Sequence, residues 1–197
     1  MRAARASKTP TWSTMKSIFR FQSQLVGGAA VLAVATFSLV AAAKLSKTGE
    51  SSAGFKAAGP AGLNIEGKTS DMTVADDGTT VTITVPLGNL KTGIELRDKH
   101  TKDYLEVDKY PNAKLEVPRA SLKFDGGEGD AKGKFTIHGQ TKDATFHYTA
   151  KKSGDTFDIK GTTKVNMNDY GIKTPTYMGV GVKPDVDVFA NFQAKDN

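Results

Sequence analysis

The chain has 197 residues, which suits one ordinary domain with additions at its ends, or two small domains. It contains no cysteine, and this excludes disulfide scaffolds, thiolate nucleophiles, Cys-ligated zinc and iron–sulfur clusters. The formal net charge is +6, but residues 1–43 hold five basic residues and no acidic one, so the remainder carries 22 basic and 21 acidic residues. The body of the chain therefore gives no electrostatic reason to expect a nucleic-acid partner.

Residues 1–43 have the organisation of a secretory signal peptide. A basic stretch precedes 19 uncharged residues, Leu25 to Ala43, and the run closes on three alanines of the kind that signal peptidase requires. An uncleaved segment tethered to the inner membrane is the alternative, because 19 residues nearly span a bilayer. The run is rich in Ala and Gly, which favours cleavage after Ala43. We expect a periplasmic or otherwise exported protein, with a linker at 44–50 and a domain at 51–197.

From Leu63 onward, short segments alternate between apolar and polar residues and are separated by Gly, Asp, Asn and Lys clusters. Such alternation is typical of antiparallel strands with one buried face, and about eight or nine of them predict an all-β sandwich or barrel. One helix of two or three turns is predicted around 94–104. The predicted strands lie at 63–68, 72–75, 80–85, 114–117, 121–124, 134–138, 145–150, 156–167 and 185–193.

Two of these strands, 134–138 and 144–150, predict a hairpin. Placing Ile137 opposite Tyr148 makes Lys142-Asp143 a two-residue loop and sets His138 across from His147 on the outer face. Two imidazoles without a third ligand make a poor metal site, so solvated histidines are the favoured interpretation. A metal-assisted enzyme that uses this pair would need a further ligand within reach.

Residues suited to catalysis are not grouped in any recognisable pattern. There is no G-x-S-x-G sequence, and Ser121 and Ser153 have no partner at a useful spacing. The carboxylates of Asp76-Asp77, Asp185 and Asp187 lie in a turn or on the polar side of a strand, and Gly126–Gly129 fits a hairpin loop. We therefore expect neither an enzyme nor a cofactor.

Four stretches, in order, are similar to signature segments of the YceI-like family of polyisoprenoid-binding, lipocalin-like proteins. The most specific one runs from T-G-I-E-L-R-D-K-H at 92–100 through Y-L-E-V at 104–107 to D-K-Y-P at 108–111. It is followed by F-T-I-H-G-Q-T-K at 135–142, D-Y-G-I at 169–172, and V-G-V with V-D-V at 180–188. Ser52–Phe55 resembles the family's opening strand.

This resemblance implies an eight-stranded antiparallel β-barrel that holds a long isoprenoid or similar amphiphilic lipid in its lumen. The residue types alone are equally compatible with a barrel that is filled by its own side chains. Such a protein would be a non-enzymatic envelope or stress protein that acts through protein contacts on its surface. The residues expected to line the apolar lumen are Ile83, Val85, Leu105, Leu115, Phe135, Ile137, Phe146, Tyr148, Phe157, Ile159, Val165, Met167, Val188 and Phe192.

The polar end of such a lipid would remain near the barrel mouth. Arg97, His100 and Tyr104 lie in the one predicted helix, which is the expected lid, so we assign head-group contact to them. A carrier or storage protein of this kind would contact membranes transiently.

Overall fold

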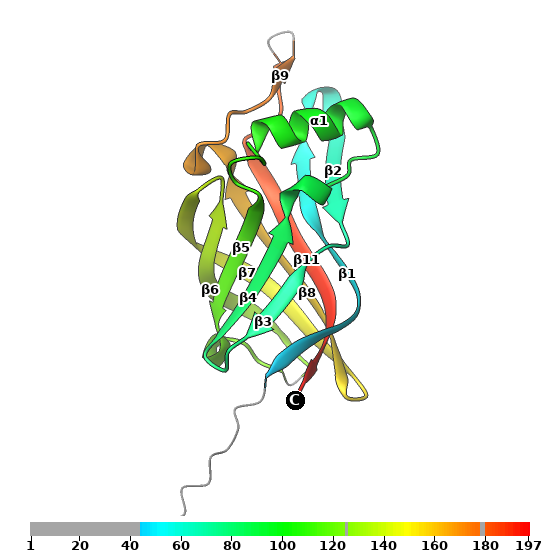
Figure 1. Cartoon of the computed structure of the whole chain (residues 1–197), viewed down its shortest axis with the longest axis vertical. Coiled ribbons are helices and arrows are strands. Elements are labelled where there is room, and N and C mark those ends of the chain that lie inside the picture. The colour runs from blue at the N-terminus through cyan, green and yellow to red at the C-terminus, as the bar shows by residue number, and fades with distance from the viewer. Residues whose placement is uncertain (1–43, 125, 178–179) are drawn as a thin grey trace, which may run out of the picture. The chain divides into compact units, whose positions relative to one another are not determined.

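The computed structural model describes residues 44–124, 126–177 and 180–197, which all belong to one compact unit. Nine strands form one antiparallel sheet in the order β2-β1-β11-β8-β7-β6-β5-β4-β3, and β9 pairs with β10 in a separate ladder (Figure 1). The strands are β1 Leu45–Ala58, β2 Asn64–Thr69, β3 Thr73–Asp76, β4 Thr80–Pro86, β5 Asn112–Pro118, β6 Glu128–Ile137, β7 Gln140–Ser153, β8 Thr156–Asn166, β9 Thr176–Tyr177, β10 Val180–Gly181 and β11 Asp185–Asp196. The predicted signal peptide lies outside the described residues.

The sheet curls into a barrel, which brings both of its outer strands, β2 and β3, against β1. β2 pairs with the second half of β1, while β3 lies beside the first half, where the Leu45 N–H donates to Asp76 Oδ2 at 2.7 Å. β2 and β3 thus serve as one strand interrupted at 70–72, which accounts for nine strands where eight were expected. The predicted all-β, lipocalin-like barrel is confirmed.

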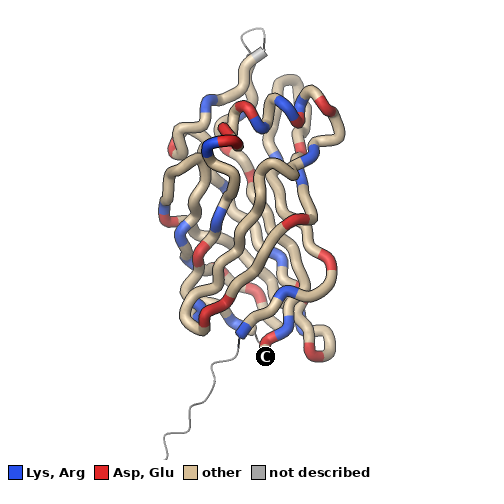
Figure 2. The backbone as a smooth tube through the Cα atoms, viewed as in Figure 1, with Lys and Arg blue, Asp and Glu red and all other residues tan. Residues whose placement is uncertain are grey.

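The one α-helix of the described residues, α1 (Glu95–Tyr104), confirms the helix predicted around 94–104. Four short 3-10 turns join the strands, at η1 Pro60–Gly62, η2 Leu87–Asn89, η3 Arg119–Ser121 and η4 Met167–Tyr170. The predicted strand at 121–124 is wrong, because η3 and an irregular segment occupy this region. Lys, Arg, Asp and Glu are spread along the strands and over both ends of the barrel (Figure 2).

Residues 44–50 are not a linker as predicted. β1 begins at Leu45, which is buried and paired with Asp196, and Lys44 exchanges two backbone hydrogen bonds with Asn197. The register between β1 and β11 shifts between Thr48 and Ser51, so a bulge interrupts the alternation. The bulge and the Gly, Ser and Lys content of this stretch explain why it does not read as a strand.

The β6–β7 hairpin has a different register from the one predicted. Ile137 pairs with Gln140, and the loop is His138-Gly139, whose φ angles of +52° and +72° are those of a type I′ turn. Tyr148 instead pairs with Gly129, and His147 pairs with Asp130. The register differs from the prediction by an even number of residues, so the inward face is unchanged while the two histidines are separated.

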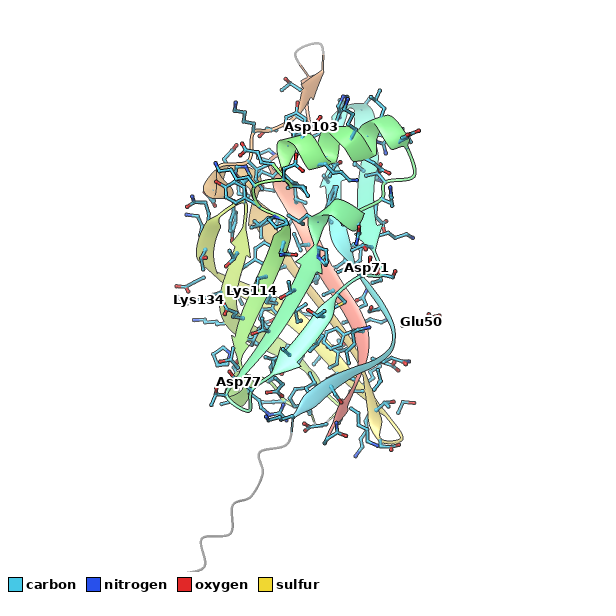
Figure 3. All side chains as sticks on the ribbon, viewed as in Figure 1. Glu50, Asp71, Asp77, Asp103, Lys114 and Lys134 are labelled. Carbon is cyan, nitrogen blue, oxygen red and sulfur yellow. The ribbon has the colours of Figure 1, made fainter. Side chains whose placement is uncertain are left out.

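An ion-pair cluster closes one end of the barrel. The Arg119 guanidinium contacts the carboxylates of Asp76 and Asp196, and the Asp76 side chain has no exposed surface. Arg119 also lies over the ring of Phe124, 5.2 Å from its centroid. The cluster therefore joins β3, β11 and the segment that follows β5. Asp77, labelled in Figure 3, marks the same end of the barrel.

Candidate ligand-binding cavity

The barrel contains an apolar cavity of about 700 Å³. This volume lies in the range of about 300–1,000 Å³ that is usual for small-molecule sites. Strand residues with inward-facing side chains supply most of the lining. α1, the segments around η1, η2 and η3, and residues 170–176 with Val182 add to it. Such a lining suits an apolar ligand, because it offers few polar partners.

Thirteen of the fourteen predicted lumen residues line this cavity. They are Ile83, Val85, Leu105, Leu115, Phe135, Ile137, Phe146, Tyr148, Ile159, Val165, Met167, Val188 and Phe192. Phe157 does not: it is buried, and its ring packs edge-on against Phe124 at 5.8 Å between centroids. Phe157 lies beside the closed end of the barrel. Alternation predicts the face of a side chain but not its depth along the barrel, so it could not distinguish this position from the lumen. That the thirteen contact a ligand stays a prediction.

α1 covers the cavity with a polar face. Arg97, His100, Thr101 and Tyr104 recur at the i, i+3, i+4 and i+7 spacing of one helix face, and all four line the cavity. An ordinary surface helix turns apolar residues inward, whereas these four positions of α1 place polar side chains at the cavity. That they contact the polar end of a ligand stays a prediction. Thr101, which the sequence analysis missed, donates its hydroxyl to the Arg97 carbonyl at 2.8 Å.

Asp98 holds the first turn of the lid. Its Oδ1 accepts hydrogen bonds from the Thr92 N–H at 2.6 Å and the Thr92 hydroxyl at 2.7 Å. These hydrogen bonds, the backbone one first, hold the pKa of the Asp98 carboxyl below its usual value. Lys91 lies 3.8 Å from the other carboxylate oxygen and is bridged to Lys68 of β2 through backbone hydrogen bonds. The lid is thereby tied to the sheet.

Large apolar side chains continue from the cavity to the outside at the mouth. Leu63, Ile94 and Leu96 line the cavity but are 46, 50 and 63% exposed. Leu63 follows η1 and the other two lie at the start of α1, so these segments form the rim; Figure 1 shows α1 across this end of the barrel, and Asp103 marks it in Figure 3. Nothing in the sequence marks this rim, because an isolated Leu or Ile carries no signal of exposure.

Phe55 and Tyr170 are among the aromatic residues that line the cavity without having been predicted. Phe55 of β1 lies across from Gly67 of β2, where an added Cβ would approach the Phe55 ring to 2.4 Å. Tyr170 of η4 is buried and packs edge-on against Phe135 at 5.7 Å between centroids. Both lie in segments that resembled the family, which was the one available signal for them.

The structure separates His138 from His147, which the predicted register had placed opposite one another. His138 lies in the β6–β7 turn, whereas the His147 ring bonds Asp130 on the outer surface at 3.0 Å. Across 44–124, 126–177 and 180–197 there is no group of three or more metal-ligating side chains. Within the same segments, no helix is both long and apolar enough to cross a membrane.

Sequence comparison places these features among known proteins. A family profile described as the YceI-like domain matches residues 42–194. Relatives named UPF0312 protein are 37% identical over 101 residues in Pseudomonas putida and 37% identical over 103 residues in Pseudomonas syringae. These matches cover 47 and 48% of this chain and 52 and 53% of the relatives, so the chain spans about half the length of the curated relatives it matches.

Solved structures share the fold at low sequence identity. A polyisoprenoid binding domain from Saccharophagus degradans, implicated in plant cell wall breakdown, matches with a TM-score of 0.64 and 16% identity, over 79% of this chain and 99% of that one. BcnA of Burkholderia cenocepacia matches with a TM-score of 0.60 and 17% identity, over 73 and 96%. The Campylobacter jejuni YCEI protein matches with a TM-score of 0.55 and 20% identity, over 68 and 86%.

Proposed function

The chain belongs to the YceI-like family, and from this premise we propose that it binds a long apolar lipid of the polyisoprenoid type in the lumen of its barrel and acts as a carrier or store. The observation that carries the proposal is the apolar cavity of about 700 Å³ beneath a helix with a polar inner face. A structural relative described as a polyisoprenoid binding domain supports the ligand class.

The driving force for this binding is burial of apolar surface. Transfer of such surface out of water contributes about 25 cal/mol per Å², so an isoprenoid chain needs few polar contacts within the strands. The head group would lie against the polar face of α1, where Arg97, His100 and Tyr104 offer a cation, an imidazole and a phenol. No bond is made or broken in this scheme, and binding without catalysis is the activity we propose.

We further propose that the protein works outside the cytoplasm and takes up its lipid by transient contact with a membrane. The basic stretch and the 19 uncharged residues that precede the barrel support export. The exposed Leu63, Ile94 and Leu96 support membrane contact, because they extend the apolar lining to the rim. A lipid leaving a bilayer at this rim would pass into the cavity with little exposure to water.

Native mass spectrometry of the exported protein, followed by solvent extraction and lipid analysis, tests the proposal. We expect one stoichiometric apolar adduct, and the same spectrum gives the mature N-terminus. A protein that carries no adduct, and whose mass is unchanged after incubation with polyprenol, would overturn lipid binding. The search for function would then move to protein contacts on the outer surface of the barrel.

A further inference from the structure

A histidine lies between two hydrogen-bond acceptors where the lid joins the barrel. His138 Nδ1 is 3.1 Å from the Tyr170 carbonyl oxygen, and His138 Nε2 is 3.5 Å from Glu106 Oε1. The side chain is 11% exposed, and Nε2 is buried without a hydrogen-bond partner in the described part of the chain. A carbonyl and a carboxylate can only accept. A neutral imidazole has one N–H and can serve one of them, whereas an imidazolium has two and can serve both.

The backbone holds these groups in place. Glu106 directly follows Leu105, the C-cap of α1, with φ +47°, and His138 has φ +52° in the β6–β7 turn. Non-glycine residues seldom adopt this conformation, and it persists where the surroundings impose it. The Tyr110 ring packs on the His138 ring at 4.8 Å between centroids, and a Cβ on Gly139 would lie 2.5 Å from Tyr110 Cε1. The turn is therefore docked on the segment 105–110, which is the C-terminal hinge of the lid.

The charged neighbours of His138 come from the two segments packed against it. From the hinge, Lys109 Nζ lies 3.8 Å from Glu106 Oε2 and over the Tyr110 ring. A hydrogen bond to Tyr110, and then the negative charge of Glu106, raise the pKa of Lys109. Asp108 is exposed in the same hinge. From η4, Asp169 precedes Tyr170, whose pKa is raised by burial and then by that carboxylate. One free face of the Glu106 carboxylate thus remains for His138, and Lys109 takes the other.

We propose that protonation of His138 locks the C-terminal hinge of the lid to the barrel, so that the lid opens more slowly at acidic than at neutral pH. As regulation of the cavity this rests on the proposed function, although the lock itself requires no ligand. Histidine changes charge between about pH 5 and 8. The imidazolium donates to both acceptors and the neutral ring to only one, so the protonated form makes the stronger lock.

Hydrogen–deuterium exchange of the unliganded full chain tests the lock directly. After correction for intrinsic exchange rates, we expect the amides of 105–110 to be about three- to tenfold better protected at pH 5 than at pH 8, the range for a partly exposed ion pair. His138→Asn, which keeps a donor for Tyr170 and tolerates positive φ, removes this difference, and so does Glu106→Gln. His147→Asn, which breaks the remote pair with Asp130, leaves it intact. Equal protection at both pH values in the wild type, or a difference that survives in His138→Asn, overturns the proposal.

Release of retinol into phosphatidylcholine vesicles measures the consequence for the cavity. This isoprenoid alcohol is uncharged across the range, so we expect its release to slow at pH 5 by a factor similar to that of the exchange, in the wild type and in His147→Asn. Failure to bind retinol would count against lipid binding, while the exchange experiment would still decide the lock. If the pH dependence of retinol release disappears in His100→Gln and remains in His138→Asn, the pH-sensitive group is His100 on the inner face of the lid. This result would overturn the assignment of the lock to His138.

Discussion

At one end of the barrel Arg119 joins two carboxylates, one of them fully buried, whereas at the other end Leu96 is 63% exposed beside an apolar cavity. The closed end is held by ion pairs, packed aromatic rings and the pairing of Lys44 with Asn197. The open end carries exposed apolar side chains and a polar helix face turned inward. We therefore expect stability and the proposed ligand binding to depend on opposite ends, so that substitutions affect one without the other.

The largest effect is expected at the closed end. Arg119→Met leaves the buried Asp76 carboxylate without its ionic partner, which should lower the free energy of unfolding by about 3–5 kcal/mol. Urea unfolding measures this change. Lys134→Met, which breaks the exposed pair with Asp143, is the control and should cost less than about 1 kcal/mol. Equal losses in the two variants would show that burial of the cluster does not matter.

Filling the cavity should abolish binding while the fold is kept. Gly161 lies on the inward face of β8, and a Cβ there would meet only ordinary contacts, 3.8 Å from the Ala190 oxygen and 4.0 Å from that of His147. Gly161→Phe should therefore weaken retinol binding by about tenfold or more, or about 1.4 kcal/mol, in a fluorescence titration. The neighbouring Lys160 is exposed on the outer face of β8, so Lys160→Phe is the control and should bind retinol like the wild type. Undiminished affinity in Gly161→Phe would place the ligand elsewhere.

Loosening the lid anchor should have an intermediate effect that depends on pH. The pKa of Asp98 is lowered by its bonds from Thr92, so the anchor is present above the ordinary aspartate value of about 3.9 and is lost as the pH falls through the lower folded value. Asp98→Ala should speed retinol release and hydrogen exchange at 92–104 several-fold at neutral pH. Asp98→Asn retains an acceptor and should lie closer to the wild type. A release rate unchanged by either substitution would mean that the lid does not gate the cavity.

The smallest effect is expected at the rim. Leu96→Ser removes an exposed apolar group, so the free energy of unfolding should change by no more than about 0.5 kcal/mol. Transfer of retinol from phosphatidylcholine vesicles should nonetheless become slower, because the rim no longer enters the bilayer surface as readily. Lys99→Ser on the same helix is the matched control and should transfer at the wild-type rate. Equal transfer by both variants would remove the rim from the proposed route.

Alternation was sufficient to predict the inward face of most strands. In Thr80–Val85 every second residue is apolar, and Ile83 and Val85 both line the cavity. The prediction of the β6–β7 pairing was wrong, yet its inward residues were right, because an even register shift preserves the face. Depth along the barrel has no such periodic signal, and Phe157 was therefore assigned to the lumen when it packs beside the closed end.

Features that depend on contacts between distant segments could not be predicted. Leu45 pairs with Asp196, but its flanking Gly, Ser and Lys residues are typical of a linker. Asp76 reads as a solvated carboxylate in a turn, although it ends β3 and is buried against Arg119 of η3. Glu106 and His138 show nothing unusual in the sequence, since their left-handed backbone is imposed by packing.

The pairing of β1 with β11 also dictates when the protein can fold. These strands are the first and last of the barrel, so the contact between them spans nearly the whole domain. Domains dominated by such distant strand pairings fold in milliseconds to seconds, far more slowly than helical bundles. Until Asp185–Asp196 has been synthesised, the edges of β1 and β8 have no partner and are open to association with other chains. The newly made chain is therefore most prone to aggregation in the interval before its final strand docks.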